Sequence, residues 1–308
     1  MNDLQVLVIN LDRSVDRLAR IDAALQALDL PFTRVPAVDG RQLSEAERSQ
    51  AIDEATYQRR HGMSSLPGEI GCYLSHVKAI RQFLDSNARA ALILEDDVQP
   101  DAALPAVLRA LLECPAHWDM VKISGVHSGT PVRVRPLTPD HWLAVMLSRC
   151  TGASAYVINR TAAAVYLQQL LPMTLPYDHV YDQGWRFGLQ IRLVTPLAAH
   201  HDQQVATTIA PTAPGRSRKF HWTRRLPAFA YRLGNEWRRV RYALGQLRQP
   251  RVQPLRRRRR PWPAHGEPAP ALLPRRANRS SRPREGSAAR GRAGPRVPSA
   301  PRRSGPAH

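Results

Sequence analysis

Short apolar runs alternate with helical patterns along the first part of the chain. The segments Leu4–Ile9 and Ala91–Leu94 contain almost only apolar residues, as strands do when a sheet buries them on both faces. Over residues 18–28 and 71–84, apolar side chains instead recur every three or four positions, which is the spacing of one helix face. Strands and helices in this order predict an α/β fold, a mostly parallel central sheet flanked by helices.

The pattern continues beyond residue 100, where it predicts one helix at 161–171 and strands at 118–124 and 190–194. Residues 151–158 predict a loop of small residues followed by a further strand. A short strand at Phe32–Val35, ended by Pro36, belongs to the first half of the same sheet. The alternation of predicted strands and helices ends near Ile209. We therefore expect residues 1–214 to form one domain.

Two different segments follow this domain. In residues 215–249, the spacing of apolar side chains predicts a helix with one apolar stripe, and its arginines lie mostly off the stripe. The stripe consists of Trp222, Leu226, Phe229, Leu233, Trp237, Val240, Leu244 and Leu247. Residues 250–308 are rich in Pro, Arg, Ala, Gly and Ser and poor in apolar residues, so we expect a disordered basic tail.

The positive charge of the chain is concentrated after the domain. A formal net charge of +20 and a pI of about 11.2 are typical of nucleic-acid-binding proteins. Residues 211–308, however, hold 26 of the 45 Lys and Arg and 3 of the 25 Asp and Glu, so the first 210 residues are slightly acidic. A polyanion- or nucleic-acid-binding protein acting through the Arg-rich tail is thus an alternative. We expect no specific nucleic acid, because residues 250–308 offer only Trp262 for base stacking.

The sequence predicts no membrane-spanning segment. Its start lacks the features of a signal peptide, no apolar run reaches the roughly 18–20 residues of a spanning helix, and three unpaired cysteines suit a reducing compartment. We expect a cytoplasmic protein that lies peripherally at the inner face of the cytoplasmic membrane.

A basic helix with two tryptophans on its apolar stripe, over residues 222–247, suits an anionic lipid surface. The alternative is that this stripe packs on the domain.

Two segments of the domain carry candidate chemistry. Glu95, Asp96 and Asp97 follow a buried strand directly, and carboxylates at such a strand end lie where open α/β sheets bind ligands. There they can bind Mg²⁺ or Mn²⁺, or form only an acidic surface loop. Upstream, a segment with Gly68 and Gly71 leads into a helix whose N-terminus could hold an anion, although its histidine is more often structural in such a loop.

Several motifs occur together and in one order along the first 210 residues. They are VINLDRS at 8–14 with Arg17, AVDG at 37–40, GEIGCYLSHVKAI at 68–80, LILEDDV at 92–98, WDMVKISG at 118–125, TGASAYVINRTAA at 151–163 and PYDHVYDQGW at 176–185. Taken together, they resemble glycosyltransferase family 25, which contains lipooligosaccharide and lipopolysaccharide sugar transferases and relatives that glycosylate collagen. Each motif alone is weak, whereas their shared order is highly specific.

The resemblance implies a GT-A-like fold, a UDP-sugar donor, an ion of the Mn²⁺ type (or Mg²⁺) and inversion at the anomeric carbon. Carried over by motif, it implies that Glu95 and Asp97 hold the metal and the diphosphate, and that Asp96 touches the donor. The other donor-binding residues that it implies are Asn10, Arg13, Arg17, Asp39, Ser75, His76 and Lys78.

Inverting transfer also needs a general base that removes the proton of the acceptor hydroxyl. The carboxylates after the last core loop are Asp178 and Asp182. Asp178 follows Pro176-Tyr177 and fits the family pattern better, whereas Asp182 also fits a solvated helix position. His200 or His201 could supply a late metal ligand, although a pair of histidines in a loop is more often incidental.

We therefore expect an inverting, metal-dependent glycosyltransferase. It would move a hexose, galactose or glucose, from a UDP-sugar to a saccharide acceptor of the lipooligosaccharide or lipopolysaccharide type, which we expect to be lipid-linked. A catalytically inert family member is a further alternative, against which the presence of Glu95, Asp97 and Asp178 argues.

Overall fold

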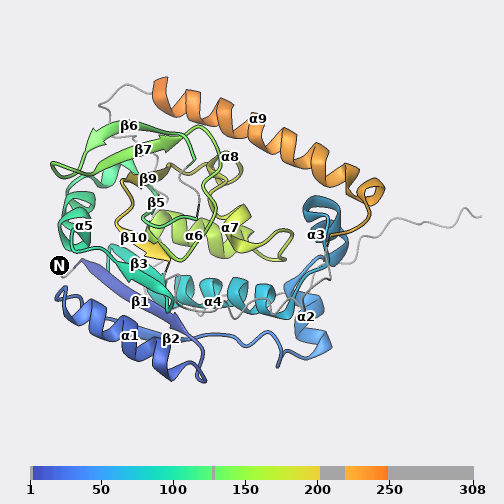
Figure 1. Cartoon of the computed structure of the whole chain (residues 1–308), viewed down its shortest axis with the longest axis horizontal. Helices are drawn as coiled ribbons and strands as arrows, with labels where there is room; N and C mark the ends of the chain where they lie inside the picture. The colour runs from blue at the N-terminus through green and yellow to red at the C-terminus, as the bar shows by residue number, and fades with distance from the viewer. Residues whose placement is uncertain (1–2, 127–128, 202–218, 249–308) are drawn as a thin grey trace, which may run out of the picture. The chain divides into compact units, whose positions relative to one another are not determined.

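The computed structural model describes residues 3–126, 129–201 and 219–248 (Figure 1). All of them belong to one compact unit. The segment 250–308, for which the sequence predicts a disordered tail, lies outside the described residues, as does the expected end of the core near Ile209.

A central eight-stranded sheet has the strand order β2-β1-β3-β8-β5-β9-β7-β6. The strands are β1 (Leu4–Asn10), β2 (Thr33–Pro36), β3 (Ala90–Glu95), β5 (Met120–Lys122), β6 (Pro131–Pro136), β7 (Trp142–Met146), β8 (Ala155–Asn159) and β9 (Ile191–Thr195). Only β8 and β7 run against the other strands of this sheet. The α/β fold with a mostly parallel central sheet is therefore confirmed, and its architecture is that of a GT-A-like domain.

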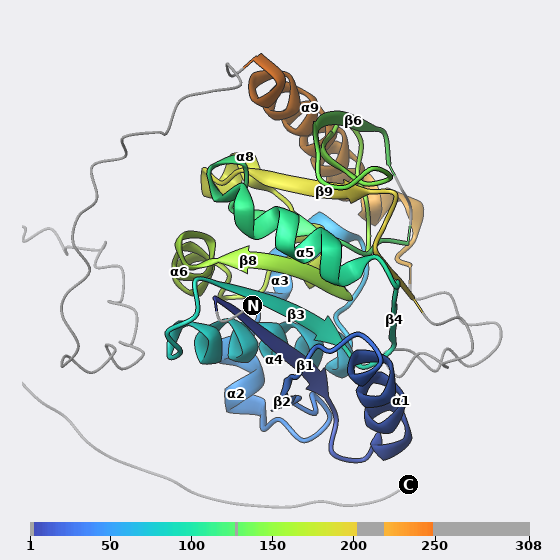
Figure 2. The same cartoon turned by 90° about the vertical axis from the view of Figure 1, so that its left-hand side faces the viewer.

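Helices cover both faces of the sheet (Figures 1 and 2). Because successive side chains of a strand point to opposite faces, Val6 and Val8 belong to one buried core and Leu7 and Ile9 to the other. The first core is closed by α1 (Val15–Gln26) and α5 (Leu104–Glu113). The second is closed by α2 (Glu45–Ala51), α3 (Glu54–His61), α4 (Pro67–Leu84), α6 (Arg160–Gln169), α7 (Tyr177–Val180) and α8 (Gly184–Phe187).

A second, two-stranded sheet lies directly after the acidic triplet. It pairs β4 (Val98–Pro100) with β10 (Ala199–His201) in antiparallel register, and places His201 opposite Val98. Residues that are about a hundred positions apart in the chain thus become neighbours beside Asp97. This pairing determines which residues of β10 can reach the acidic triplet.

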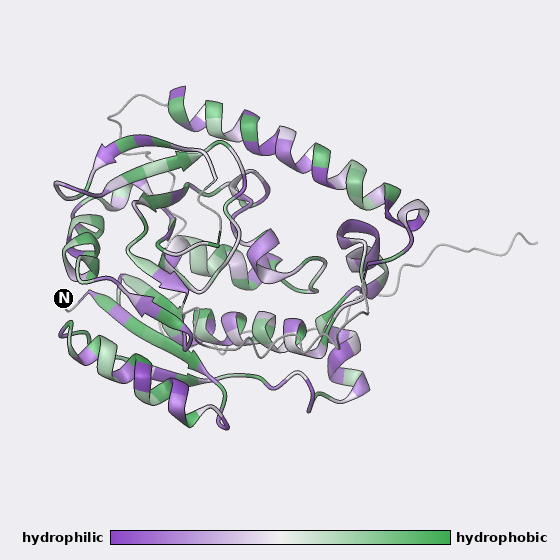
Figure 3. Cartoon of the chain, in the orientation of Figure 1, coloured by the Kyte–Doolittle hydropathy of each residue, from purple (hydrophilic) through white to green (hydrophobic). Residues whose placement is uncertain are grey.

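The helix α9 (Leu226–Arg248), preceded by the 3-10 turn η2 (Trp222–Arg225), packs against α3, α8 and β7. The apolar stripe is not the face that packs: Trp237 is 63% and Leu233 77% exposed. The buried residues of α9 are Ala228, Asn235, Arg239 and Ala243. Hydrophobic and hydrophilic residues alternate along the ribbon of α9 (Figure 3). None of the described helices has the length and apolar content that a bilayer crossing requires.

Candidate active site

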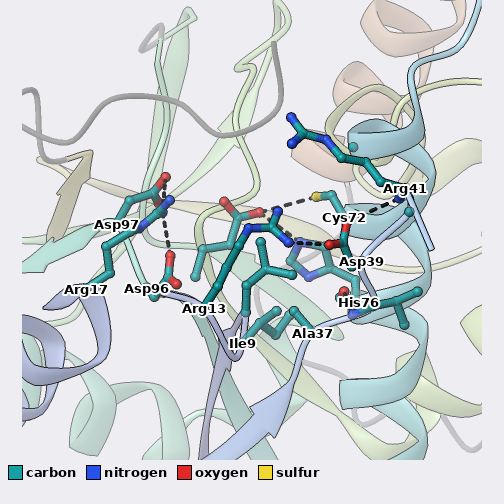
Figure 4. Close-up of a pocket in the computed structure, with 16 residues that line it drawn as sticks. Ile9, Arg13, Arg17, Ala37, Asp39, Arg41, Cys72, His76, Asp96 and Asp97 are labelled. Carbon is teal, nitrogen blue, oxygen red and sulfur yellow. Dashed lines mark hydrogen bonds and ion pairs between the residues drawn. The ribbon is translucent and has the colours of Figure 1, made fainter. Parts of the chain in front are cut away.

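Three parallel strands end side by side at one edge of the central sheet. β1 ends at Asn10, β2 at Pro36 and β3 at Glu95. Open α/β sheets bind ligands at the carboxyl ends of such strands. A pocket lies here (Figure 4), lined by Ile9, Leu11, Arg13, Arg17, Ala37, Val38, Asp39, Gly40, Arg41, Gly68, Cys72, Ser75, His76, Glu95, Asp96 and Asp97.

Arg17 bridges two carboxylates of the acidic triplet. Its guanidinium forms ion pairs with Asp96 and with Asp97, the latter at 2.9 Å between Nη2 and Oδ2 (Figure 4). On the other side, the amide of Asn10 donates a hydrogen bond of 2.7 Å to Oδ2 of Asp96. Asn10 is buried and does not line the pocket, so the structure makes it a positioning residue for Asp96.

Glu95 belongs to a different group of side chains. β3 ends at Glu95, and the chain turns through Asp96 and Asp97 before β4 begins. Glu95 Oε1 lies 3.0 Å from His76 Nε2 and accepts a hydrogen bond from Cys72 Sγ at 3.6 Å. Glu95 and Asp97, which we expected to share a metal, therefore lie in one pocket but contact different side chains.

The AVDG loop packs backbone to backbone on α4. A Cβ atom on Gly71 would lie 2.5 Å from the carbonyl oxygen of Val38, so only glycine fits there. The hydroxyl of Ser75 accepts from the amide of Val38 at 2.8 Å, and Lys78 Nζ donates to the carbonyl of Pro36 at 2.7 Å. Ser75 and Lys78, predicted to bind the donor, thus hold this loop in place, and Ser75 also lines the pocket.

The start of α4 differs from the expectation. The helix begins at Pro67, earlier than the helical pattern from Gly71 predicts, so Ser75 and His76 lie well inside it. The carboxylate of Glu69 accepts hydrogen bonds from the amide of Leu66 and the hydroxyl of Tyr57 at the helix start. An acidic side chain therefore occupies part of the N-terminus at which an anion was expected.

Opposite α4, Asp39 carries charge into the pocket. Its carboxylate pairs with Arg13 and accepts from the backbone amide of Arg41 at 3.1 Å (Figure 4). These contacts and the positive charges of both arginines outweigh burial, so that the pKa of Asp39 is lowered. The pocket therefore contains arginine side chains paired with carboxylates, which suits a ligand that is itself charged.

One carboxylate oxygen of the pocket lacks a hydrogen-bond donor among the residues that the structure describes. Oδ1 of Asp97 is buried and accepts no hydrogen bond from any described residue. Burial, followed by the charge of Glu95, raises the pKa of Asp97 to about 6. Nδ1 of His201 lies 3.6 Å from this oxygen. A carboxylate oxygen and an imidazole nitrogen at this separation could both be ligands of a divalent cation.

Asp178 lies beside this pocket. It is at the start of α7, its side chain is 31% exposed, and Oδ2 accepts from the amide of Gly152 at 3.4 Å. After burial and Glu95, the charge of Asp178 also contributes to raising the pKa of the Cys72 thiol. The carboxylate of Asp178 is partly exposed, with His179 Nε2 3.8 Å from its Oδ2, so a second substrate could reach it.

Asp182, in contrast, is fully buried in the turn between α7 and α8. Both of its oxygens accept hydrogen bonds of 3.2 Å from Arg239 of α9, and Lys122 Nζ lies 4.0 Å away. It is therefore not the solvated helix residue that the sequence suggests. An acceptor hydroxyl cannot reach a carboxylate enclosed in this way, so the geometry favours Asp178 over Asp182 as the base.

Comparison with known proteins agrees with these observations. Residues 3–125 match the family described as "Glycosyltransferase family 25 (LPS biosynthesis protein)". Procollagen galactosyltransferase 2 of Mus musculus is 30% identical over 126 residues, which cover 39% of this chain and 20% of that protein. The chain thus spans about a fifth of the length of this relative.

Two further relatives carry the family name. A glycosyltransferase 25 family member of Drosophila pseudoobscura pseudoobscura is 32% identical over 103 residues, 31% of this chain and 16% of the relative. A probable inactive glycosyltransferase 25 family member 3 of Bos taurus is 32% identical over 216 residues, 63% of this chain and 36% of the relative. The resemblance expected from the motifs is confirmed, because residues 3–125 match the model of glycosyltransferase family 25.

Proposed function

We propose that this protein is an inverting, metal-dependent glycosyltransferase that moves a hexose, galactose or glucose, from a UDP-sugar to a lipid-linked saccharide acceptor of the lipopolysaccharide type. The observation that carries the proposal is the buried Asp97 Oδ1, which has no hydrogen-bond donor among the described residues and lies in a pocket at three parallel strand ends. The family description and the relatives named galactosyltransferases support the reaction class.

The donor set at this oxygen fits Mn²⁺ or Mg²⁺. Asp97 and His201 would hold the ion, with Glu95 facing the same pocket. When bound, the ion would neutralise the diphosphate charge that develops as the sugar leaves. Arg13 and Arg17 place two further cations at the pocket, where they can pair with phosphate oxygens.

Asp178 is the residue that we propose as the general base for the acceptor hydroxyl. Its exposed carboxylate would accept the proton of the acceptor hydroxyl as that oxygen attacks the anomeric carbon, from the side opposite the diphosphate. Removal of a general base usually costs about 10²–10⁴-fold in rate. Asp178→Asn should therefore lower turnover strongly and leave UDP-sugar binding in place, whereas Asp97→Ala should abolish both metal dependence and activity.

A screen of UDP-sugars that measures UDP release, with saccharide acceptors and with Mn²⁺ or EDTA, tests the reaction. Wild type, Asp97→Ala and Asp178→Asn are compared with Asp12→Asn, whose side chain is 81% exposed, as the matched control. NMR of the product's anomeric proton tests inversion. If no UDP-sugar releases UDP, or if Asp97→Ala keeps full activity, the proposal fails, and the inert alternative suggested by relatives named inactive stands.

The exposed face of α9 supports a membrane-bound acceptor. Residues 222–247 place tryptophan, phenylalanine and leucine side chains outward, with the arginines Arg224, Arg238 and Arg241 also exposed. Apolar side chains can insert at the boundary of an anionic membrane, where the neighbouring arginines are attracted to the anionic lipids. The alternative that the stripe packs on the domain does not hold, because the face that packs carries Asn235 and Arg239 instead.

Sedimentation with vesicles of phosphatidylglycerol and phosphatidylcholine tests this surface. The double substitution Leu233→Ser and Trp237→Ser keeps every arginine, including those of residues 250–308, and removes two exposed apolar side chains. Burial of each is worth about 1.5–3 kcal/mol, so we expect at least about a tenfold loss of affinity. Equal binding by wild type and variant would show that the arginines alone attract the vesicles, and would exclude the stripe as a membrane contact.

A further inference from the structure

A thiol, an imidazole and a carboxylate converge at the edge of the pocket. Cys72 and His76 are four residues apart on α4, which places both on one helix face, and Glu95 ends the facing strand β3. One ligand atom from each lies within 4.8 Å of the others. The measured contacts are 3.0 Å from His76 Nε2 and 3.6 Å from Cys72 Sγ to the same oxygen, Glu95 Oε1.

The two separations from Glu95 Oε1 are close to those of a coordination shell. An ion bound at about 2.3 Å to sulfur and about 2.0–2.1 Å to nitrogen and oxygen keeps its tetrahedral ligands about 3.3–3.6 Å apart. The two separations involving Glu95 Oε1 lie close to that range without an ion. Small rotations of the Cys72 and Glu95 side chains would therefore be enough to complete a three-ligand set.

The surroundings of His76 hold its ring in the orientation that a ligand needs. Its ring is 1% exposed and stacks on Tyr177, with ring centroids 4.0 Å apart. Nδ1 lies 3.2 Å from the hydroxyl of Tyr156, which itself lies 2.8 Å from the hydroxyl of Tyr177. Metal-binding histidines usually donate the other ring N–H to such an oxygen, which fixes the tautomer that leaves Nε2 free for the ion.

We propose that Cys72, His76 and Glu95 form a site for a thiophilic divalent cation such as Zn²⁺, with its fourth coordination position open to the pocket. A ligand set with one sulfur favours Zn²⁺, whereas the Asp97 and His201 pair contains no sulfur and suits Mn²⁺ or Mg²⁺. The thiol proton leaves to solvent as the ion binds, and the thiolate sulfur becomes the ligand. The proposal does not depend on the glycosyltransferase reaction.

The three cysteines of the chain provide matched controls. Cys114 and Cys150 are buried, and among the residues that the structure describes only the group at Cys72 combines three ligand types. Co²⁺ replaces Zn²⁺ in such sites and gives a thiolate-to-cobalt charge-transfer band in the near ultraviolet. We expect the full-length, metal-stripped protein to give this band with one equivalent of Co²⁺, and Zn²⁺ to remove it.

The band should vanish in Cys72→Ser and persist in Cys114→Ser, Cys150→Ser and Asp97→Ala. His76→Ala should weaken Co²⁺ binding at least tenfold. No band in wild type, or a band that survives Cys72→Ser, overturns the proposal. Because Cys72→Ser could unfold the protein, alkylation of wild type with N-ethylmaleimide is measured as well. Zn²⁺ must slow modification of Cys72 in peptide mass spectra, and an unchanged rate also overturns the proposal.

Discussion

Asp97 is a carboxylate that the fold holds in an unfavourable environment. Burial, followed by the charge of Glu95, raises its pKa from 3.8 to about 6 despite the ion pair with Arg17. Asparagine has nearly the same shape and no charge. We therefore expect Asp97→Asn to stabilise the metal-free protein at neutral pH, because burial and the charge of Glu95 disfavour the ionised form of Asp97.

The pKa shift sets the size of this effect. A rise of about two units corresponds to about 3 kcal/mol, which is an upper limit because asparagine also loses the ion pair with Arg17 at 2.9 Å. We expect a net gain of about 1–2 kcal/mol. Since the folded-state pKa of Asp97 lies above its unfolded value, the cost of its charge is absent below about pH 4 and complete above about pH 6. The advantage of the variant should therefore grow between these values and then stay constant.

Thermal unfolding in EDTA at pH 4.5 and pH 7.5 measures this difference. At pH 7.5 the Tm of Asp97→Asn should exceed that of wild type by about 2–8 °C, and at pH 4.5 by much less. Added Mn²⁺ should raise the Tm of wild type and leave the variant unchanged. Asp12→Asn, at an exposed position, controls for loss of charge alone. An equal Tm difference at both pH values, or a less stable variant at pH 7.5, would refute the reasoning.

Three further substitutions test other parts of the structure. Arg239→Met removes both hydrogen bonds to the buried Asp182 carboxylate, leaves Lys122 at 4.0 Å as its remaining cation, and should cost about 3–5 kcal/mol in urea unfolding. Gly71→Ala should cost about 1–3 kcal/mol by the same measurement, because its methyl group would meet backbone atoms, whereas Gly245→Ala, in open space, should not destabilise the protein. In calorimetric titrations, His201→Ala should weaken Mn²⁺ binding at least tenfold, and His200→Ala should have little effect.

The sequence predicts the elements with strong periodicity. The strands at Leu4–Asn10 and Ala90–Glu95 follow from apolar runs, and they are the elements that position the acidic triplet. The helix Glu45–Ala51 was missed because it is short and polar. Its start does carry a sequence signal, since Ser44 and Glu47 form a capping box, so the spacing Ser-x-x-Glu could have revealed it.

The candidate site follows from the sequence only in part. Carboxylates at a strand end can be read from one segment, and their place in a pocket is as expected. The proximity of His201 to Asp97 cannot be read from one segment, because it arises from pairing between β10 and β4 across about a hundred residues. In the sequence, His200 and His201 look alike, and only the strand register shows which of them approaches Asp97. Likewise, the bridge from Arg17 to two carboxylates needs the helix α1 to be placed on the sheet.

The packing of α9 shows why the apolar stripe alone could not predict how this helix docks. Its inner face is held largely by polar contacts: Arg239 pairs with Asp182, and Tyr242 donates from its hydroxyl to the carbonyl of Leu189 at 2.7 Å. Burying an ion pair brings little net stability, because desolvation offsets the attraction, but such a pair tolerates only one geometry. An apolar interface would accept several rotations of the helix, including one with the stripe turned inward. The polar contacts are made in one rotation of the helix, and this rotation leaves Leu233 and Trp237 facing outward.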